Sequence, residues 1–174
     1  FALSEGVDES SINEAISTLL LVRRRQEVRG VYNGAIVIDD FAHHPRAVEL
    51  TTAGIKSLYP DRKVKVVIEP NSATARSSIF QDEFSKALMI ADHVLFARPQ
   101  RHSSVKGTTD LDGEAIIEDL KSNGIEGSIH SDLLTLRDAI DSICDQNTVL
   151  LVLSNGTCLG LWQSDFVSKL ELDV

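Results

Sequence analysis

The chain has 174 residues, of which 43% are hydrophobic, so it is long enough for one well-buried core and too short for two domains of ordinary size. Its formal net charge of -9 disfavours nucleic acid and anionic membrane partners, because an acidic surface repels their phosphates. The two cysteines, Cys144 and Cys158, form no CxxC pair, so the sequence suggests neither a zinc knuckle nor a disulfide framework, and it fits a reducing cytoplasm.

The first predicted element is a helix within residues 1–22. Apolar residues recur there at helical spacing after two candidate N-caps: Ser10 and Ser11 are followed by Ile12, Ala15, Ile16 and Leu19. The chain begins without an initiator methionine, so we expect a piece of a longer protein. No apolar run approaches the ~20 residues of a membrane span, and the start lacks the order of a signal peptide. We therefore expect a cytoplasmic protein.

A β-hairpin is predicted next, followed by strands and helices in alternation. Asn33-Gly34 favours a tight turn between residues 27–32 and residues 35–38. Pro45 suits the first turn of a helix that runs to about Leu58. The later strands are expected at residues 64–68, 93–96, 128–130 and 148–153, and the later helices at residues 77–90, 113–123, 133–144 and 164–170. The predicted fold is α/β: a doubly wound, mostly parallel sheet with an N-terminal β-hairpin.

Ligands of such a sheet bind beyond the carboxyl ends of its strands, which directs attention to the loops there. The motif IDDFAHHP, residues 38–45, gathers two carboxylates and two imidazoles at that edge. The cluster suits a sugar hydroxyl, a metal or a phosphate acceptor. An equal alternative is that Asp40 caps the helix and the histidines are solvated or packed. His43 and His44 are adjacent and cannot both face one ion on a regular helix, so no metal site is predicted.

Three further segments are candidates for anion or substrate binding. In EPNSATAR, residues 69–76, the entrance of a helix and Arg76 can hold a carboxylate or phosphate, although an ordinary capped loop explains the pattern equally well. In LSNGT, residues 153–157, Gly156 permits close backbone approach or simply a turn. The arginine run at residues 23–25 has two interpretations: a solvated charged patch, or a group that contacts a nucleotide phosphate. The chain has no GxxxxGK[ST] motif, so it lacks a P-loop for ATP.

Three segments in this order resemble the C-terminal domain of Mur ligases: RRRQEVRGVYNGAIVIDDFAHHP, VVIEPNSATARSSIFQDEF and LVLSNG. The resemblance covers about residues 12–174. DDFAHHP, EPxSxTxR and FQDEF are most similar to the ligases that join murein tripeptide, L-alanyl-γ-D-glutamyl-meso-diaminopimelate, to UDP-N-acetylmuramate in peptidoglycan recycling. The resemblance implies that residues 1–22 are the terminal helix of a preceding central domain and that residues 23–174 are the C-terminal domain.

The resemblance also implies a reaction and a division of labour. ATP phosphorylates a muramyl carboxylate, and the incoming amine attacks the acyl phosphate. The N-terminal domain of the same chain would hold UDP-N-acetylmuramate, and the central domain would hold most of the ATP and magnesium. The C-terminal domain, which is the domain in this chain, would present the tripeptide. No catalytic residue is expected here, and the fragment alone is predicted to be inactive because the P-loop lies elsewhere.

Carried onto this sequence, the resemblance implies two groups of binding residues. Arg25 would approach the nucleotide, and Asp40 would accept hydrogen bonds from its ribose hydroxyls. His43 and His44 would lie near the nucleotide. The peptide site would comprise Ser72, Thr74, Arg76, Ser154, Asn155 and Gly156. Tripeptide ligases commonly read EPRS and SNGGF, whereas this chain has Asn71 in the first motif and Thr157-Cys158 in the second.

Two alternative functions remain open. Another Mur ligase, such as the one that adds L-alanine, would share the same domain. A non-catalytic α/β binding module would also lack a P-loop. A signalling receiver is disfavoured, because it needs a phosphoacceptor Asp after its third strand and Phe96 is followed here by Ala97-Arg98-Pro99.

Overall fold

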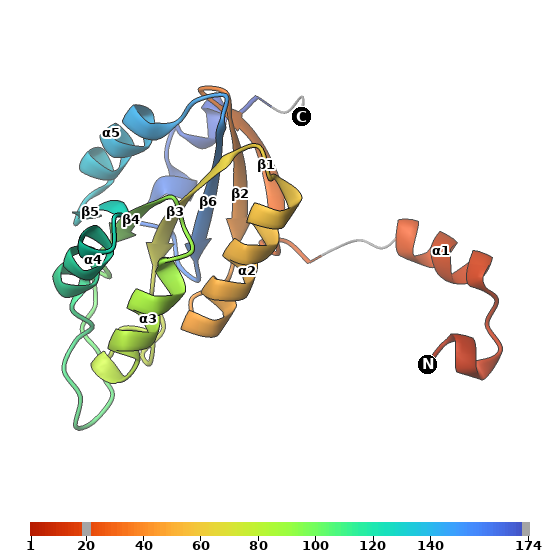
Figure 1. The fold of residues 1–174 in the computed structure, drawn as a ribbon, viewed down its shortest axis with the longest axis horizontal. Coiled ribbons are helices and arrows are strands. Elements are labelled where there is room, and N and C mark those ends of the chain that lie inside the picture. Colours follow the sequence, from red (N-terminus) through yellow and green to blue (C-terminus); the bar gives the residue numbers. More distant parts are fainter. Residues whose placement is uncertain (19–21, 172–174) are drawn as a thin grey trace.

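The computed structural model describes residues 1–18 and 22–171 and contains a six-stranded sheet with helices on both faces (Figure 1). The strands are β1 (Glu27–Tyr32), β2 (Ala35–Asp40), β3 (Lys63–Glu69), β4 (His93–Ala97), β5 (Glu126–His130) and β6 (Thr148–Ser154). The α-helices are α1 (Glu9–Ser17), α2 (Pro45–Leu58), α3 (Gln81–Leu88), α4 (Gly113–Ser122) and α5 (Leu133–Ile143). The strand order is β1-β2-β6-β3-β4-β5, and only β1 and β2 pair antiparallel within this sheet. The predicted fold class is confirmed.

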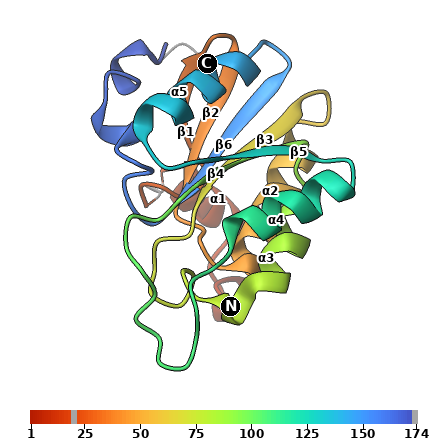
Figure 2. The same cartoon turned by 90° about the vertical axis from the view of Figure 1, so that its left-hand side faces the viewer.

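The sheet has a separate apolar core on each face. Helices α2, α3 and α4 cover one face, whereas α5 and the segment after β6 cover the other (Figure 2). Neighbouring residues of one strand divide between the two cores, as Leu150 and Leu151 of β6 do. All seven residues of β6 are buried, which is typical of a central parallel strand covered on both sides.

Local sequence signals placed several elements correctly. The hairpin turns at Asn33 and Gly34, whose φ angles of 50° and 85° are those of a type I′ turn. Helix α2 begins at Pro45 and ends at Leu58, as predicted. The cap of α1 is Asp8 rather than Ser10 or Ser11, because its carboxylate accepts the Ser11 N–H at 2.9 Å. Leu19, expected in the same helix, lies outside the described residues.

Two predicted helices differ from the structure. The helix expected at residues 164–170 was wrong: 3₁₀ helices form instead at Leu161–Gln163 and Val167–Lys169. Ser164 separates them in an extended conformation, and its hydroxyl donates to the Leu161 carbonyl at 2.8 Å, which competes with helical hydrogen bonding. The helix expected from Ser77 starts as the 3₁₀ turn Ser78–Phe80, and α3 begins only at Gln81.

The connections between strands define where a ligand can enter the sheet. The chain leaves β3 toward the face of α3, whereas it leaves β6 toward the face where Leu161 packs in one core with Leu136 of α5. Glu69 and Ser154 are register partners at the carboxyl ends of these two strands. This topological switch point is the expected location of a ligand crevice. Within the described residues, no helix is long and apolar enough to cross a membrane.

Candidate functional site

Asp39, near the end of β2, ties the arginine run to the sheet. Its buried carboxylate accepts a hydrogen bond from Arg24 Nε at 3.1 Å and lies 3.4 Å from Arg29 Nη1. Burial raises the pKa of Asp39, and the charges of Arg24 and Arg29 oppose that shift. Arg24 also donates from Nη2 to the Ser154 carbonyl at 2.5 Å. Residues 23–26 are therefore held against the carboxyl ends of β2 and β6.

Asp40 connects two loops through its carboxylate. One oxygen accepts the Ala42 N–H at 2.7 Å, and the other accepts the Gln26 N–H at 2.8 Å. The cap of α2 is His44, whose Nδ1 accepts the Arg46 N–H at 3.4 Å, so the interpretation of Asp40 as the helix cap was wrong. Each oxygen of Asp40 keeps a second lone pair. Its role toward ribose hydroxyls stays a prediction.

The two loops that Asp40 connects form a basic and aromatic surface. The guanidinium of Arg25 lies 5.4 Å from the centroid of the exposed Phe41 ring, and that of Arg24 lies 5.7 Å from it. His43 joins the same loop through a 2.8 Å contact between its Nδ1 and the Phe41 carbonyl. The structure thus gathers three of the four predicted nucleotide residues, and it adds Phe41, which the sequence reasoning did not single out.

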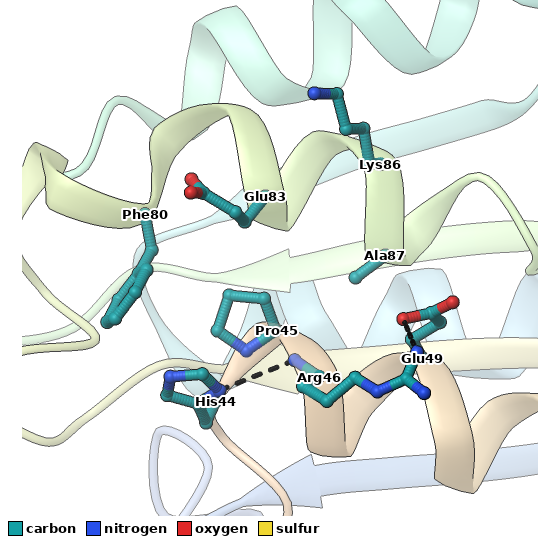
Figure 3. Close-up of a pocket in the computed structure, with 8 residues that line it drawn as sticks. All are labelled: His44, Pro45, Arg46, Glu49, Phe80, Glu83, Lys86 and Ala87. Carbon is teal, nitrogen blue, oxygen red and sulfur yellow. Dashed lines mark hydrogen bonds and ion pairs between the residues drawn. The ribbon is translucent and has the colours of Figure 1, made fainter.

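His44, the fourth predicted nucleotide residue, faces a groove between α2 and α3 (Figure 3). Its ring packs edge-on against Phe80 with the ring centroids 4.6 Å apart. The groove has a volume of about 340 Å³ and is lined by His44, Pro45, Arg46, Glu49, Phe80, Glu83, Lys86 and Ala87. Figure 3 shows the two rings at one end and Arg46, Glu49 and Lys86 toward the other.

Glu69 organises the switch point, although the sequence reasoning did not identify it. Its side chain is buried, and one oxygen accepts the Ser154 hydroxyl at 2.7 Å and the Cys158 N–H at 3.0 Å. The other oxygen accepts the Leu159 N–H at 3.2 Å. Cys158 and Leu159 have φ angles of 54° and 53°, so Glu69 stabilises a left-handed backbone that non-glycine residues rarely adopt. Burial raises the pKa of Cys158, which keeps this thiol protonated and unsuited to nucleophilic attack.

The two loops predicted to form the peptide site interlock at the switch point. The Asn71 N–H donates to Asn155 Oδ1 at 3.1 Å. A Cβ atom added to Gly156 would lie 2.6 Å from Glu69 Oε2 and would also clash with the Asn71 amide. A side chain at residue 156 would therefore displace the side chains of Glu69 and Asn71, which glycine avoids where residues 154–160 pass against residues 69–71. Ser154, Asn155 and Gly156 are brought together here as predicted.

The other predicted peptide residues mainly shape their own loop. The Ser72 hydroxyl accepts the Ala75 N–H at 3.2 Å, and Thr74 is exposed. Arg76 donates from Nη1 to the Asn71 carbonyl and from Nε to the His102 carbonyl at 3.3 Å. These bonds join the loop after β3 to the loop after β4. The proposed grip of Arg76 on a substrate carboxylate stays a prediction.

A pocket of about 520 Å³ opens beside the interlocked loops. Its walls come from the loops after four parallel strands, and its lining residues are Glu69, Asn71, Gln100, Arg101, Ser131, Asp132, Gly156, Thr157 and Leu159. The strand ends predict these loops as ligand-binding loops, but no motif signals Arg101 or Asp132, because they meet the other loops only in the folded chain. The described residues contain no cluster of three or more His, Cys, Asp or Glu side chains that would hold a metal ion.

Comparison with known proteins agrees with this architecture. Residues 23–156 match the family model described as Mur ligase, glutamate ligase domain. A UDP-N-acetylmuramate–L-alanine ligase of Acidithiobacillus ferrooxidans is 31% identical over 90% of this chain and 33% of its own length. The corresponding ligase of Desulforapulum autotrophicum is 36% identical over 79% of this chain and 28% of its own. The chain thus spans about a third of the length of such relatives.

Solved structures of longer ligase chains contain the same fold. The UDP-N-acetylmuramate–alanine ligase of Thermotoga maritima superposes with a TM-score of 0.72 and 25% identity, over 97% of this chain and 34% of its own. A murein peptide ligase of Psychrobacter arcticus gives a TM-score of 0.69 and 25% identity, over 99% of this chain and 36% of its own. Because the family model matches most of the length of this chain, the chain belongs to the Mur ligase family and is a Mur ligase C-terminal domain.

Proposed function

We propose that this domain presents the amino substrate in an ATP-dependent amide ligase, and that the parent protein attaches murein tripeptide to UDP-N-acetylmuramate. The pocket at the switch point carries the proposal. It lies where ligands of doubly wound sheets bind, and four loops supply its polar walls. Its volume of about 520 Å³ leaves room for an amino substrate longer than a single alanine.

The residues of this chain would act by binding and orientation. The reaction forms an acyl phosphate from the muramyl carboxylate and the terminal phosphate of ATP, and attack by the amine then releases inorganic phosphate. The interlocked loops around Glu69 and Gly156 would hold the amine in line with the acyl phosphate. Holding two reacting groups in the correct geometry accelerates their reaction, because the entropy of bringing them together is lost on binding. The surface of Arg25 and Phe41 fits a nucleotide, because a guanidinium matches phosphate and a ring matches the base. Magnesium would be held by the central domain.

A division into two domains is part of the same proposal. We propose that residues 1–22 include the last helix of the central domain. Helix α1 buries none of its residues within the described chain, as expected of a helix whose apolar face packs elsewhere. Ile16 on that helix is 64% exposed. Residues 23–174 would then form the C-terminal domain.

L-Alanine is the second candidate for the amino substrate. It is favoured by the two relatives above, which are named as L-alanine ligases and share 31% and 36% identity with this chain. The two candidates differ in size and in the number of carboxylates. They are therefore separable by direct competition.

The full-length parent protein, given ATP, magnesium and UDP-N-acetylmuramate, should release ADP in the presence of tripeptide and form the nucleotide-linked peptide. A coupled enzyme assay measures the release of ADP, and mass spectrometry identifies the nucleotide-linked peptide. We expect kcat/KM for tripeptide to exceed that for L-alanine by about a hundredfold or more, because the longer substrate uses more of the pocket. The isolated 174-residue chain should form no product. A preference for L-alanine would transfer the assignment to the second candidate, and no product with either would contradict the amide ligase.

A further inference from the structure

We propose that β5 pairs with β5 of a second copy of this chain, so that two sheets join edge to edge in a symmetric dimer. β5 is the outermost strand of the sheet, at the edge opposite β1 (Figure 2). No strand among the described residues pairs with its outer side. Because the N-terminal segment leads into β1, a preceding domain would join this chain at the opposite edge of the sheet.

The backbone groups of Gly127 and Ile129 face the open side of β5. The Arg98 N–H, which follows β4, donates to the His130 carbonyl at 2.8 Å, so the backbone groups of His130 face β4. Backbone groups alternate in direction along a strand, and those of Ile129 and Gly127 therefore point away from β4. Such a row of open donors and acceptors is a template for another strand.

β5 lacks the features by which proteins usually block pairing at a sheet edge. Residues 126–130 contain neither proline nor lysine nor arginine, and their register with β4 is continuous, without a bulge. Gly127 has no side chain, and that of Ser128 is small, so a second strand can approach closely. The strand is therefore open to pairing both in its backbone and in its side chains.

A two-fold axis at Ser128 gives an antiparallel register in which the open groups meet. Gly127 then lies opposite the partner's Ile129, and the two residues exchange both of their backbone hydrogen bonds. The hydroxyl of Ser128 faces its own copy across the axis. Glu126 lies opposite the partner's His130. The strand is thus complementary to itself, which favours a second copy of this chain over an unrelated strand.

A hollow beside β5 fits the same arrangement. It has a volume of about 700 Å³ and is lined by Glu114, Ile117, Glu118, Lys121, Ser122, Ser128 and Ile129. Ser128 and Ile129 belong to opposite faces of the sheet, so the hollow opens at the edge itself. The two-fold axis sets the two copies of α4 antiparallel. Lys121, near the end of each α4, then approaches Glu114 and Glu118 of the partner subunit, and opposite charges favour that orientation.

Sedimentation equilibrium of the full-length parent protein tests the dimer. The wild type should form dimers with Kd in the micromolar range, as expected of a small interface. Ser128→Lys places two ammonium groups across the axis, so it should raise Kd about a hundredfold or more. Ser128→Glu should do the same. An equimolar mixture of these two variants should recover the dimer, because unlike charges then meet. Ser168→Lys, at an exposed serine after β6, is the matched control and should leave Kd unchanged.

Hydrogen exchange of the wild type tests the pairing without any substitution. The amides of Gly127 and Ile129 should exchange more slowly as the protein concentration rises, because they become hydrogen-bonded only in the dimer. A wild type that stays monomeric at every concentration would overturn the proposal. A dimer that forms equally well in Ser128→Lys, or whose formation leaves exchange at Gly127 and Ile129 unchanged, would also overturn it. None of these measurements requires turnover, so they are independent of the proposed function.

Discussion

Glu69→Ala should lower the free energy of unfolding of the domain by about 3 kcal/mol. The substitution removes the acceptor of three hydrogen bonds, from the Ser154 hydroxyl and from the N–H groups of Cys158 and Leu159. Each buried donor that loses its partner costs about 1 to 3 kcal/mol, and relief of the desolvated charge offsets part of the sum. Unfolding in urea, followed by circular dichroism, measures the loss.

Two further variants separate this hydrogen-bond network from a general effect of charge. Glu69→Gln keeps the shape and one acceptor oxygen, so its loss should be intermediate. Glu118→Ala removes an exposed carboxylate from α4 and should change stability by less than about 0.5 kcal/mol. If Glu69→Ala is as stable as Glu118→Ala, the loop after β6 does not depend on Glu69.

Gly156→Ala should reduce kcat/KM for the amino substrate by about a hundredfold in the full-length enzyme. The added Cβ would lie 2.6 Å from Glu69 Oε2 and would clash with the Asn71 amide, so the side chain of Asn71 and that of Glu69, which holds the two loops together, must shift. A displacement of about 1 Å in groups that position a substrate costs on the order of a hundredfold in rate. Overpacking at this point should also cost about 1 to 3 kcal/mol of stability. Steady-state kinetics with each substrate varied in turn measures the effect.

The matched control is Gly54→Ala, at a helical glycine of α2 where a Cβ meets no atom within 4 Å. Alanine is the better helix former there, so stability and kinetics should be unchanged or slightly improved. The KM for ATP should be normal in both variants, because the nucleotide surface lies on other loops. Wild-type kinetics in Gly156→Ala would show that the interlocked loops do not shape the substrate site.

Features encoded by local sequence were predicted well. The Asn33-Gly34 turn and the start of α2 at Pro45 follow from backbone preferences of single residues. The parallel strands follow from continuous apolar runs, and their carboxyl ends pointed to the loops that form the switch point. The helix predicted at residues 164–170 failed because the hydroxyl of Ser164 and the packing of the C-terminal segment on α5 outweigh its apolar spacing.

The site depends on contacts that local sequence does not reveal. Glu69 carries one signal, an acidic residue that ends a buried strand, but its partners are about 90 residues away in the chain. Arg76 looks available in its motif, yet it donates to two backbone carbonyls. Arg101 lies in a long loop without regular structure, and its place in the pocket is set by Gln100 and the loop after β5. Such placements follow from tertiary structure alone.

We expect the amino substrate to bind at the β3–β6 switch point. A crystal structure of the full-length enzyme with UDP-N-acetylmuramate, a non-hydrolysable ATP analogue and tripeptide would show its position. Tripeptide density should lie in the pocket between Asn71 and Gly156. Tripeptide density elsewhere, such as in the groove between His44 and Phe80, with no density in the switch-point pocket, would contradict it.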